Sequence, residues 1–307
     1  MQHYFRTITF LKPILLASVL VLVGCGCSSS DANKPSVLPV VLDNNSYGVI
    51  GDNKLQAGLD AIRTAYTVPA IAGFIIKGDS ILEMGVSGVR KSNTSVAVTL
   101  NDRWSIGSVT KSLTATIAMT LVEQGSISLS STILDVMPEM AGQIKAEYLS
   151  ITLKELLSHT SGLVRDLPYL TDLQWFNSKQ PLKEQRRLWT NEMLNTDSIV
   201  ERGVFSYSNG GYVIAGHMLE TVTGQSWESL LQTQLLRPFH MTNTSLGVPD
   251  INGDLSQPRG HTFIYNAWES KSTEQRPSNP PVMAPASDFV TDLASMAQYL
   301  IAHLQGA

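Results

Sequence analysis

The stretch that decides the fold is Trp104–Lys111, W-S-I-G-S-V-T-K, which holds the only Ser-x-x-Lys of the chain, Ser108 and Lys111. A short run with strand character leads into it, and Gly107 permits a sharp turn. Apolar residues then recur at every fourth position until Gly125: Leu113, Ile117 and Leu121. This pattern predicts a strand, a turn and a helix that begins at Ser108.

The spacing of Ser108 and Lys111 has a chemical consequence. If Ser108 opens the helix, Lys111 lies about one turn further along and on the same side. A serine hydroxyl is a poor nucleophile until a neighbouring group takes its proton, and a lysine does so only when it is neutral. The helix N-terminus also favours developing negative charge. The alternative is a capping serine followed by a solvated lysine, and this pair alone leaves both open.

Composition excludes several classes of protein. The chain has 307 residues, of which 43% are hydrophobic and 16% charged, and its formal net charge is -4. It is therefore long and apolar enough for one large domain or two lobes with a buried core. Charges are scattered, so no basic patch predicts nucleic-acid binding. No H-E-x-x-H motif occurs, so zinc is not implied; we expect no metal and no other cofactor.

The first residues have the pattern of a targeting segment. Arg6 and Lys12 precede a short apolar run, which predicts a signal peptide over residues 1–24 rather than a membrane span. The run ends L-V-G-C at Cys25, which resembles a bacterial lipobox and implies cleavage before Cys25 and lipidation of its sulfur. The alternative is an ordinary secretory signal with an incidental cysteine.

Polar composition predicts a flexible tether over residues 25–50, followed by a folded domain over residues 51–307. We therefore expect a lipid-anchored protein of the bacterial cell envelope that faces the periplasm or the exterior. Both cysteines, Cys25 and Cys27, precede the domain, so it contains no disulfide.

The domain begins with a predicted helix and hairpin. Apolar spacing predicts a helix over about residues 55–65, and two apolar runs joined by Gly78-Asp79 predict a hairpin over residues 70–77 and 81–86. Further on, residues 164–201 and 253–281 have the polar composition of loops. The last helix is predicted from about Thr291.

A second motif, Tyr207-Ser208-Asn209, follows the first by about a hundred residues. Ser-x-x-Lys followed by this motif resembles serine β-lactamases and penicillin-binding proteins. Tyr-x-Asn in place of Ser-Asp-Asn is similar to the branch with class C β-lactamases, D-alanyl-D-alanine carboxypeptidases and related esterases. Other segments also look like this family: Leu156–Leu163, Tyr207–Tyr212, Arg237–Thr244 and Thr291–Ala294.

The resemblance implies a role for each residue. Ser108 would attack a carbonyl and form an acyl-enzyme, with its own backbone N–H as half of an oxyanion hole. Lys111 would sit between Ser108 and Tyr207, and Tyr207 would accept the serine proton, directly or through Lys111, and return it to the leaving group. Asn209 would orient Lys111 or bind a substrate amide. The segment with His159 would be a structural turn.

The resemblance also implies an α+β fold in which a helical lobe packs on an antiparallel sheet lobe. The family's third motif, Lys-Thr-Gly or His-Thr-Gly on a late strand, has no match, since Gly260-His261-Thr262 is followed by Phe263 and comes too early. We therefore expect a C-terminally truncated member whose sheet lobe lacks its C-terminal strands. Its hairpin would have an open, adhesive edge.

The sequence thus favours a serine hydrolase acting through an acyl-serine on β-lactams, D-Ala-D-Ala peptides or small esters. Its partners would be a small molecule or a peptidoglycan peptide, and a membrane through the lipid anchor, but no nucleic acid. One alternative is a catalytically impaired, truncated relative that serves as a binding module of the cell envelope. Another is an incomplete product that does not fold.

Overall fold

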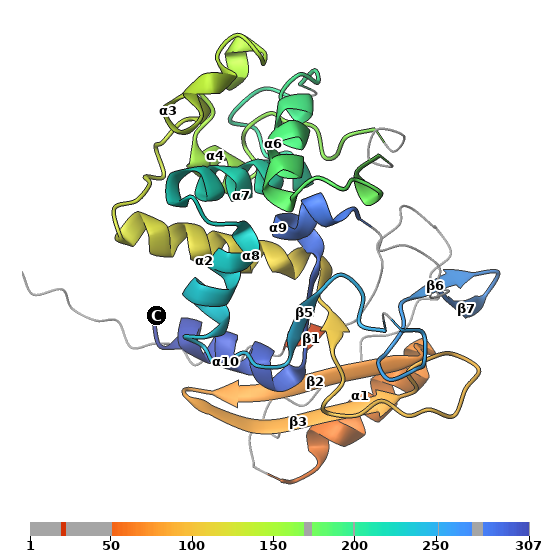
Figure 1. Ribbon diagram of the computed structural model, residues 1–307. Helices are drawn as coiled ribbons and strands as arrows, with labels where there is room; N and C mark the ends of the chain where they lie inside the picture. The colour runs from red at the N-terminus through yellow and green to blue at the C-terminus, as the bar shows by residue number, and fades with distance from the viewer. Residues whose placement is uncertain are drawn as a thin grey trace, which may run out of the picture.

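A helical lobe packs on a smaller lobe formed by a hairpin with helices on both faces (Figure 1). The computed structural model describes residues 20–22, 51–168, 174–198, 200–250, 252–271 and 279–306. The helices within this part of the chain are α1 (Lys54–Tyr66), α2 (Thr110–Glu123), α3 (Ile133–Val136), α4 (Leu153–Leu157), α6 (Leu182–Met193), α7 (Asn209–Thr223), α8 (Trp227–Leu230), α9 (Ala284–Ser287) and α10 (Leu293–Leu304). The strands are β1 (Leu20–Leu22), β2 (Ala70–Lys77), β3 (Ser80–Gly88), β4 (Trp104–Ser105), β5 (Thr244–Leu246), β6 (His261–Ile264), β7 (Ala267–Ser270) and β8 (Phe289–Thr291).

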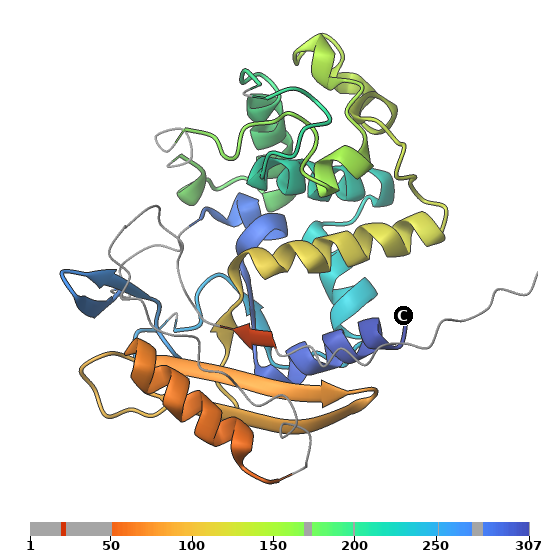
Figure 2. The same cartoon turned by 180° about the vertical axis from the view of Figure 1, so that it is seen from behind.

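The sheet lobe is built on the predicted hairpin. Strands β2 and β3 pair antiparallel, with a register shift between Ile75 and Ile76. Figure 2 shows α1 along their outer face, and α10 lies between the sheet and the helical lobe. Leu55 and Leu59 of α1 pack with Ile71 and Ile75 of β2 in a small apolar cluster. Both faces of the hairpin are thus covered by helices, and such packing stabilises a hairpin that would be marginal alone.

The sequence predicted that the hairpin has an open edge, but the outer edge of β2 is paired. Strand β1 pairs antiparallel with it, and Val21 lies opposite Gly73. The pairing satisfies part of an edge that would otherwise present free backbone groups. Strand β1 falls within residues 1–24, whose removal as a signal peptide stays a prediction.

Helix α2 runs through the core of the helical lobe, as its apolar spacing predicts. Its side chains Leu113, Ile117 and Ala118 are fully buried. Polar contacts hold it to its neighbours at Thr114, whose hydroxyl donates to the Pro285 carbonyl at 2.7 Å and accepts from the Trp227 indole at 3.1 Å. Helix α2 is therefore fixed against both α9 and α8.

A small sheet in the order β4-β8-β5 holds the segment before α2. Strand β8 is the central strand and is antiparallel to both neighbours. The Ile106 amide donates to the Phe289 carbonyl at 3.1 Å, and the Phe289 amide donates to the Thr110 hydroxyl at 3.1 Å. These bonds place the turn at Gly107 beside the end of α9.

Two segments predicted as loops contain regular structure. Residues 164–201 include α6, and residues 253–281 include the hairpin β6–β7. The last helix follows the prediction closely, since α10 begins two residues after Thr291. Helix α7 ends before Gly224, which has a left-handed conformation. Among the described residues, no helix is both long enough and apolar enough to cross a membrane.

Candidate active site

Ser108 lies on a single 3₁₀ turn, Gly107–Val109, directly ahead of α2. Gly107 has a φ of 50°, a left-handed conformation that glycine adopts without strain. The Thr110 hydroxyl donates to the Gly107 carbonyl at 2.6 Å and closes the turn. Ser108 is thereby exposed at the N-terminal end of α2.

Lys111 projects from the first turn of α2 into the interior, where the residue is 6% exposed. Its Nζ lies 2.6 Å from Asn209 Oδ1, 2.8 Å from the Ala286 carbonyl oxygen and 3.3 Å from Ser108 Oγ. All three partners are uncharged oxygens. Burial lowers the pKa of the Lys111 amine to about 8; the charge of Asp166 opposes this shift and that of Arg165 adds to it.

Tyr207 also contacts Ser108. Its hydroxyl lies 2.6 Å from Ser108 Oγ, and Lys111 Nζ lies 4.8 Å from the centre of its ring. The following residue, Ser208, is the N-cap of α7: its hydroxyl accepts from the Gly211 amide at 3.0 Å and donates to the Val164 carbonyl at 2.6 Å.

Asn209, the first residue of α7, links Lys111 to a carboxylate. Its Oδ1 accepts from Lys111, and its Nδ2 donates to Asp166 Oδ1 at 2.7 Å. The Asn209 amide also donates to the Arg165 carbonyl at 2.8 Å. The four residues singled out within the domain, Ser108, Lys111, Tyr207 and Asn209, thus meet in one cluster.

Sequence analysis missed three members of this cluster. Asp166 holds Asn209, Arg165 places its guanidinium carbon 5.2 Å from the centre of the Tyr207 ring, and Ala286 contributes a carbonyl. Arg165 and Asp166 follow the segment Leu156–Leu163, and that position was the only available signal. A backbone carbonyl such as that of Ala286 leaves no signature in a sequence.

One other feature named in the sequence lies elsewhere, and a second falls outside the described residues. His261 and Thr262, from the partial match to the third motif, are on β6, where His261 Nε2 accepts from the Ser92 amide at 2.9 Å. Cys25 and the predicted tether, residues 25–50, lie outside the described residues.

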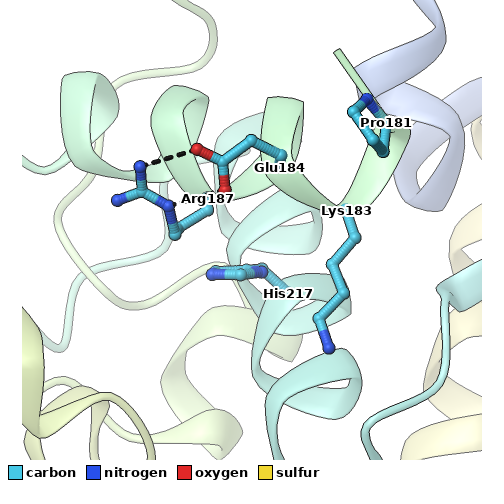
Figure 3. A pocket seen from close by; sticks show the side chains of 5 residues that line it. All are labelled: Pro181, Lys183, Glu184, Arg187 and His217. Carbon is cyan, nitrogen blue, oxygen red and sulfur yellow. Dashed lines mark hydrogen bonds and ion pairs between the residues drawn. The ribbon is translucent and has the colours of Figure 1, made fainter.

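A separate cavity of about 280 Å³ lies between α6 and α7 (Figure 3). Its lining is Pro181, Lys183, Glu184, Arg187 and His217. None of these side chains contributes to the contacts among Ser108, Lys111 and Tyr207. The cavity is therefore distinct from the cluster around Ser108.

A family model described as Beta-lactamase matches residues 53–307, which is most of the chain. The chain belongs to this family, as the motifs predicted. Its α+β, β-lactamase/transpeptidase-like fold, with helices and antiparallel sheets, agrees with that membership. Membership supports a serine hydrolase of the type that includes β-lactamases and penicillin-binding proteins.

Penicillin-binding protein 4 of Amycolatopsis lactamdurans is 31% identical over 195 residues, which is 64% of this chain and 49% of that protein. The octameric penicillin-binding protein homologue from Pyrococcus abyssi has a TM-score of 0.64 at 23% identity, over 84% of this chain and 57% of that one. D-amino acid amidase from Ochrobactrum anthropi SV3, solved with L-phenylalanine amide, has a TM-score of 0.64 at 22% identity, over 83% and 70%. The chain thus spans about half the length of this curated relative.

Proposed function

We propose that this protein is a serine hydrolase that acts through an acyl-enzyme on Ser108. The observation that carries the proposal is the position of Ser108 Oγ, 2.6 Å from the Tyr207 hydroxyl and 3.3 Å from Lys111 Nζ. A nucleophile within hydrogen-bond reach of a base that other groups orient is the arrangement of nucleophilic catalysis.

In the first half-reaction, neutral Lys111 accepts the proton of Ser108 as Oγ attacks the substrate carbonyl carbon. Two N–H groups of the amine donate to Asn209 Oδ1 and the Ala286 carbonyl, so its lone pair is directed at Ser108. The pKa of about 8 makes an appreciable fraction of Lys111 neutral near neutral pH. The C–N or C–O bond then breaks, and the leaving group takes a proton from Tyr207, whose hydroxyl lies 2.6 Å from Ser108 Oγ. This step leaves a protonated Lys111 and a Tyr207 phenolate.

In the second half-reaction, water attacks the acyl ester and gives its proton to the Tyr207 phenolate, and protonated Lys111 returns the proton to Ser108 Oγ as the acid leaves. Asn209 keeps Lys111 in place through both steps and is itself held by Asp166. The N-terminus of α2 stabilises negative charge that develops at the site.

The substrates we propose are β-lactams, D-Ala-D-Ala peptides or small esters. The names of relatives support this range, since one is a penicillin-binding protein and another is a D-amino acid amidase. All of these substrates present an activated or amide-like carbonyl to one nucleophile.

The test is covalent labelling. A fluorescent penicillin or an activated ester should add one acyl group to the purified protein, and peptide mapping should place it on Ser108. Ser108→Ala should abolish the label, while Ser112→Ala, a serine one turn further along α2, should keep it. Equal labelling of wild type and Ser108→Ala would exclude this function. Labelling without turnover would instead favour a binding module.

We also propose that the protein is lipid-anchored in the cell envelope through Cys25. The residues L-V-G-C before the predicted tether support this proposal. Cells fed an alkyne fatty acid should incorporate it into the wild-type protein and not into Cys25→Ala. Incorporation into both would place the lipid elsewhere.

A further inference from the structure

The backbone at His159 is bound to the segment that carries Tyr207. The Ser206 amide donates to the His159 carbonyl at 2.8 Å, and the Gly203 amide donates to the Thr160 carbonyl at 2.8 Å. His159 has a φ of 59°, in the left-handed region that only some residues adopt readily. This conformation turns the chain just after α4, where the backbone at His159 and Thr160 contacts the segment that carries Tyr207.

The ring of His159 makes a second connection to the same segment. Its Nδ1 accepts a hydrogen bond from the Ser208 amide at 3.1 Å. The two neighbours of Tyr207 in the chain, Ser206 and Ser208, are therefore both bound to His159. Because Nδ1 is the acceptor, the neutral ring carries its proton on Nε2.

The same ring also packs directly on Tyr207. Their ring centres are 4.6 Å apart, and two further rings lie near His159, that of Tyr212 at 5.2 Å and that of Phe205 at 5.8 Å. Aromatic rings at such distances attract each other beyond the area they bury. His159 thus holds the backbone on both sides of Tyr207 and also contacts its ring.

We propose that His159 is the positioning residue that holds the Tyr207 hydroxyl against Ser108, and that it does so only while Nδ1 is an unprotonated acceptor. The inference rests on the proposed function, because it concerns the same reaction. The described hydrogen bonds and ring contacts of His159 do not include Ser108, so we assign its effect on the chemistry to Tyr207.

The surroundings of His159 favour its neutral form. Burial lowers its pKa below the ordinary 6.5, the charge of Lys111 on α2 adds to this shift, and the bond from Ser208 opposes it. The facing groups from α7 and the segment before it are Tyr207, Tyr212 and Phe205. On its own side, Glu155 of α4 is engaged with Arg202. Protonation at low pH would place an N–H on Nδ1 against the N–H of Ser208 and break the contact.

The first test compares two substitutions of His159. Asn places its Oδ1 where Nδ1 lies and tolerates a positive φ, so His159→Asn should keep kcat for an activated ester within about threefold of wild type. His159→Gln moves the acceptor one bond further and should lower kcat about 10- to 100-fold with KM little changed, because small displacements of a reacting group have large effects on rate. A matched control is His261→Asn, which removes another ring acceptor of a backbone amide, in the hairpin β6–β7 and outside the cluster around Ser108. It should leave kcat unchanged.

The second test is the pH dependence of kcat, which does not depend on whether His159→Gln folds. In a plot of log kcat against pH, the slope below pH 6.5 should be steeper by one in the wild type than in His159→Asn. The plot for His261→Asn should have the same slope as that of the wild type. Equal acid limbs in wild type and His159→Asn would overturn the inference.

A third measurement needs no turnover. In ¹⁵N-labelled protein, the ring signals lost in His159→Asn should show Nδ1 as the unprotonated nitrogen at pH 7.5. Protonation of Nδ1 there would overturn the inference whatever the activity. Loss of Ser108 labelling in wild type would reject the proposed function instead, so the two failures are distinguishable.

Discussion

Two buried cations lie near opposite ends of α7, and their surroundings differ. Lys111 is held near the first residue of the helix by three uncharged oxygens, from Ser108, Asn209 and Ala286. Arg186 of α6 is fully buried near the other end and pairs with the carboxylates of Glu220 and Glu228. About 16 Å of helix separates Asn209 from Glu220, from a rise of 1.5 Å per residue.

The difference shows how one helix supports two kinds of site. A guanidinium between two carboxylates keeps its charge, so its role is to hold α6, α7 and α8 together. An amine without a carboxylate among its described hydrogen-bond partners is less stable when charged, and its pKa falls to about 8. Lys111 can therefore gain and lose a proton near neutral pH, as acyl transfer requires.

The largest expected effect is on the rate. Lys111→Ala should lower kcat/KM for an activated ester about 10²- to 10⁴-fold, since it removes the base from Ser108. Thermal unfolding should remain cooperative. A variant that keeps at least half of the wild-type rate would show that another group activates Ser108.

Arg186→Met should destabilise the fold by about 3–5 kcal/mol, because it leaves the buried carboxylate of Glu220 without its partner. The matched control is Arg187→Met, which removes the half-exposed pair with Glu184 and should cost at most about 1 kcal/mol. Urea unfolding measures both. Equal losses of unfolding free energy in the two variants would show that the buried ion pair of Arg186 contributes no more to stability than the half-exposed pair of Arg187.

The titration of Lys111 should make both the rate and the stability depend on pH. Below about pH 8, kcat/KM should fall about tenfold per pH unit, since the proton on Lys111 removes the base. The stability of the fold should also increase with pH. The pKa of Lys111 is about 8 in the folded protein and 10.5 in the unfolded chain, so the unfolded chain binds the proton more tightly and protonation favours unfolding. The free energy of unfolding should rise between about pH 8 and 10.5, and Lys111→Ala should remove that rise. A rate that is flat through pH 8 would contradict this account.

A smaller effect is expected where α7 meets α9. A Cβ on Gly216 would lie 2.7 Å from Cγ of Pro285, next to the Ala286 carbonyl that orients Lys111. Gly216→Ala should destabilise the fold by about 1–3 kcal/mol through overpacking, less the gain of up to about 1 kcal/mol in helix propensity. The melting temperature measures this. An increase would show that the two helices separate freely.

The sequence predicts the parts of the site that depend on local spacing. Helical periodicity places Lys111 one turn from Ser108, and the motif at Tyr207–Asn209 indicated its partner through family resemblance. The contacts of Asp166 and Ala286 join segments far apart in the chain and leave no local pattern. These two contacts could be found only in the three-dimensional structure.

The two misread loops have physical reasons. Helix α6 buries Gln185 and Arg186, which look like surface residues in a sequence; the arginine pairs there with the buried carboxylate of Glu220 and the partly buried carboxylate of Glu228. Hairpin β6–β7 turns at Tyr265-Asn266, both with positive φ, without the glycine that usually signals such a turn.

The most direct test of the central claim is the titration of Lys111 itself. In protein labelled with ¹³C at lysine Cε, the signal that disappears in Lys111→Ala should shift with a midpoint near pH 8. A midpoint near 10.5, the ordinary value for lysine, would show that the amine keeps its charge as Arg186 does, and would contradict its role as the base for Ser108.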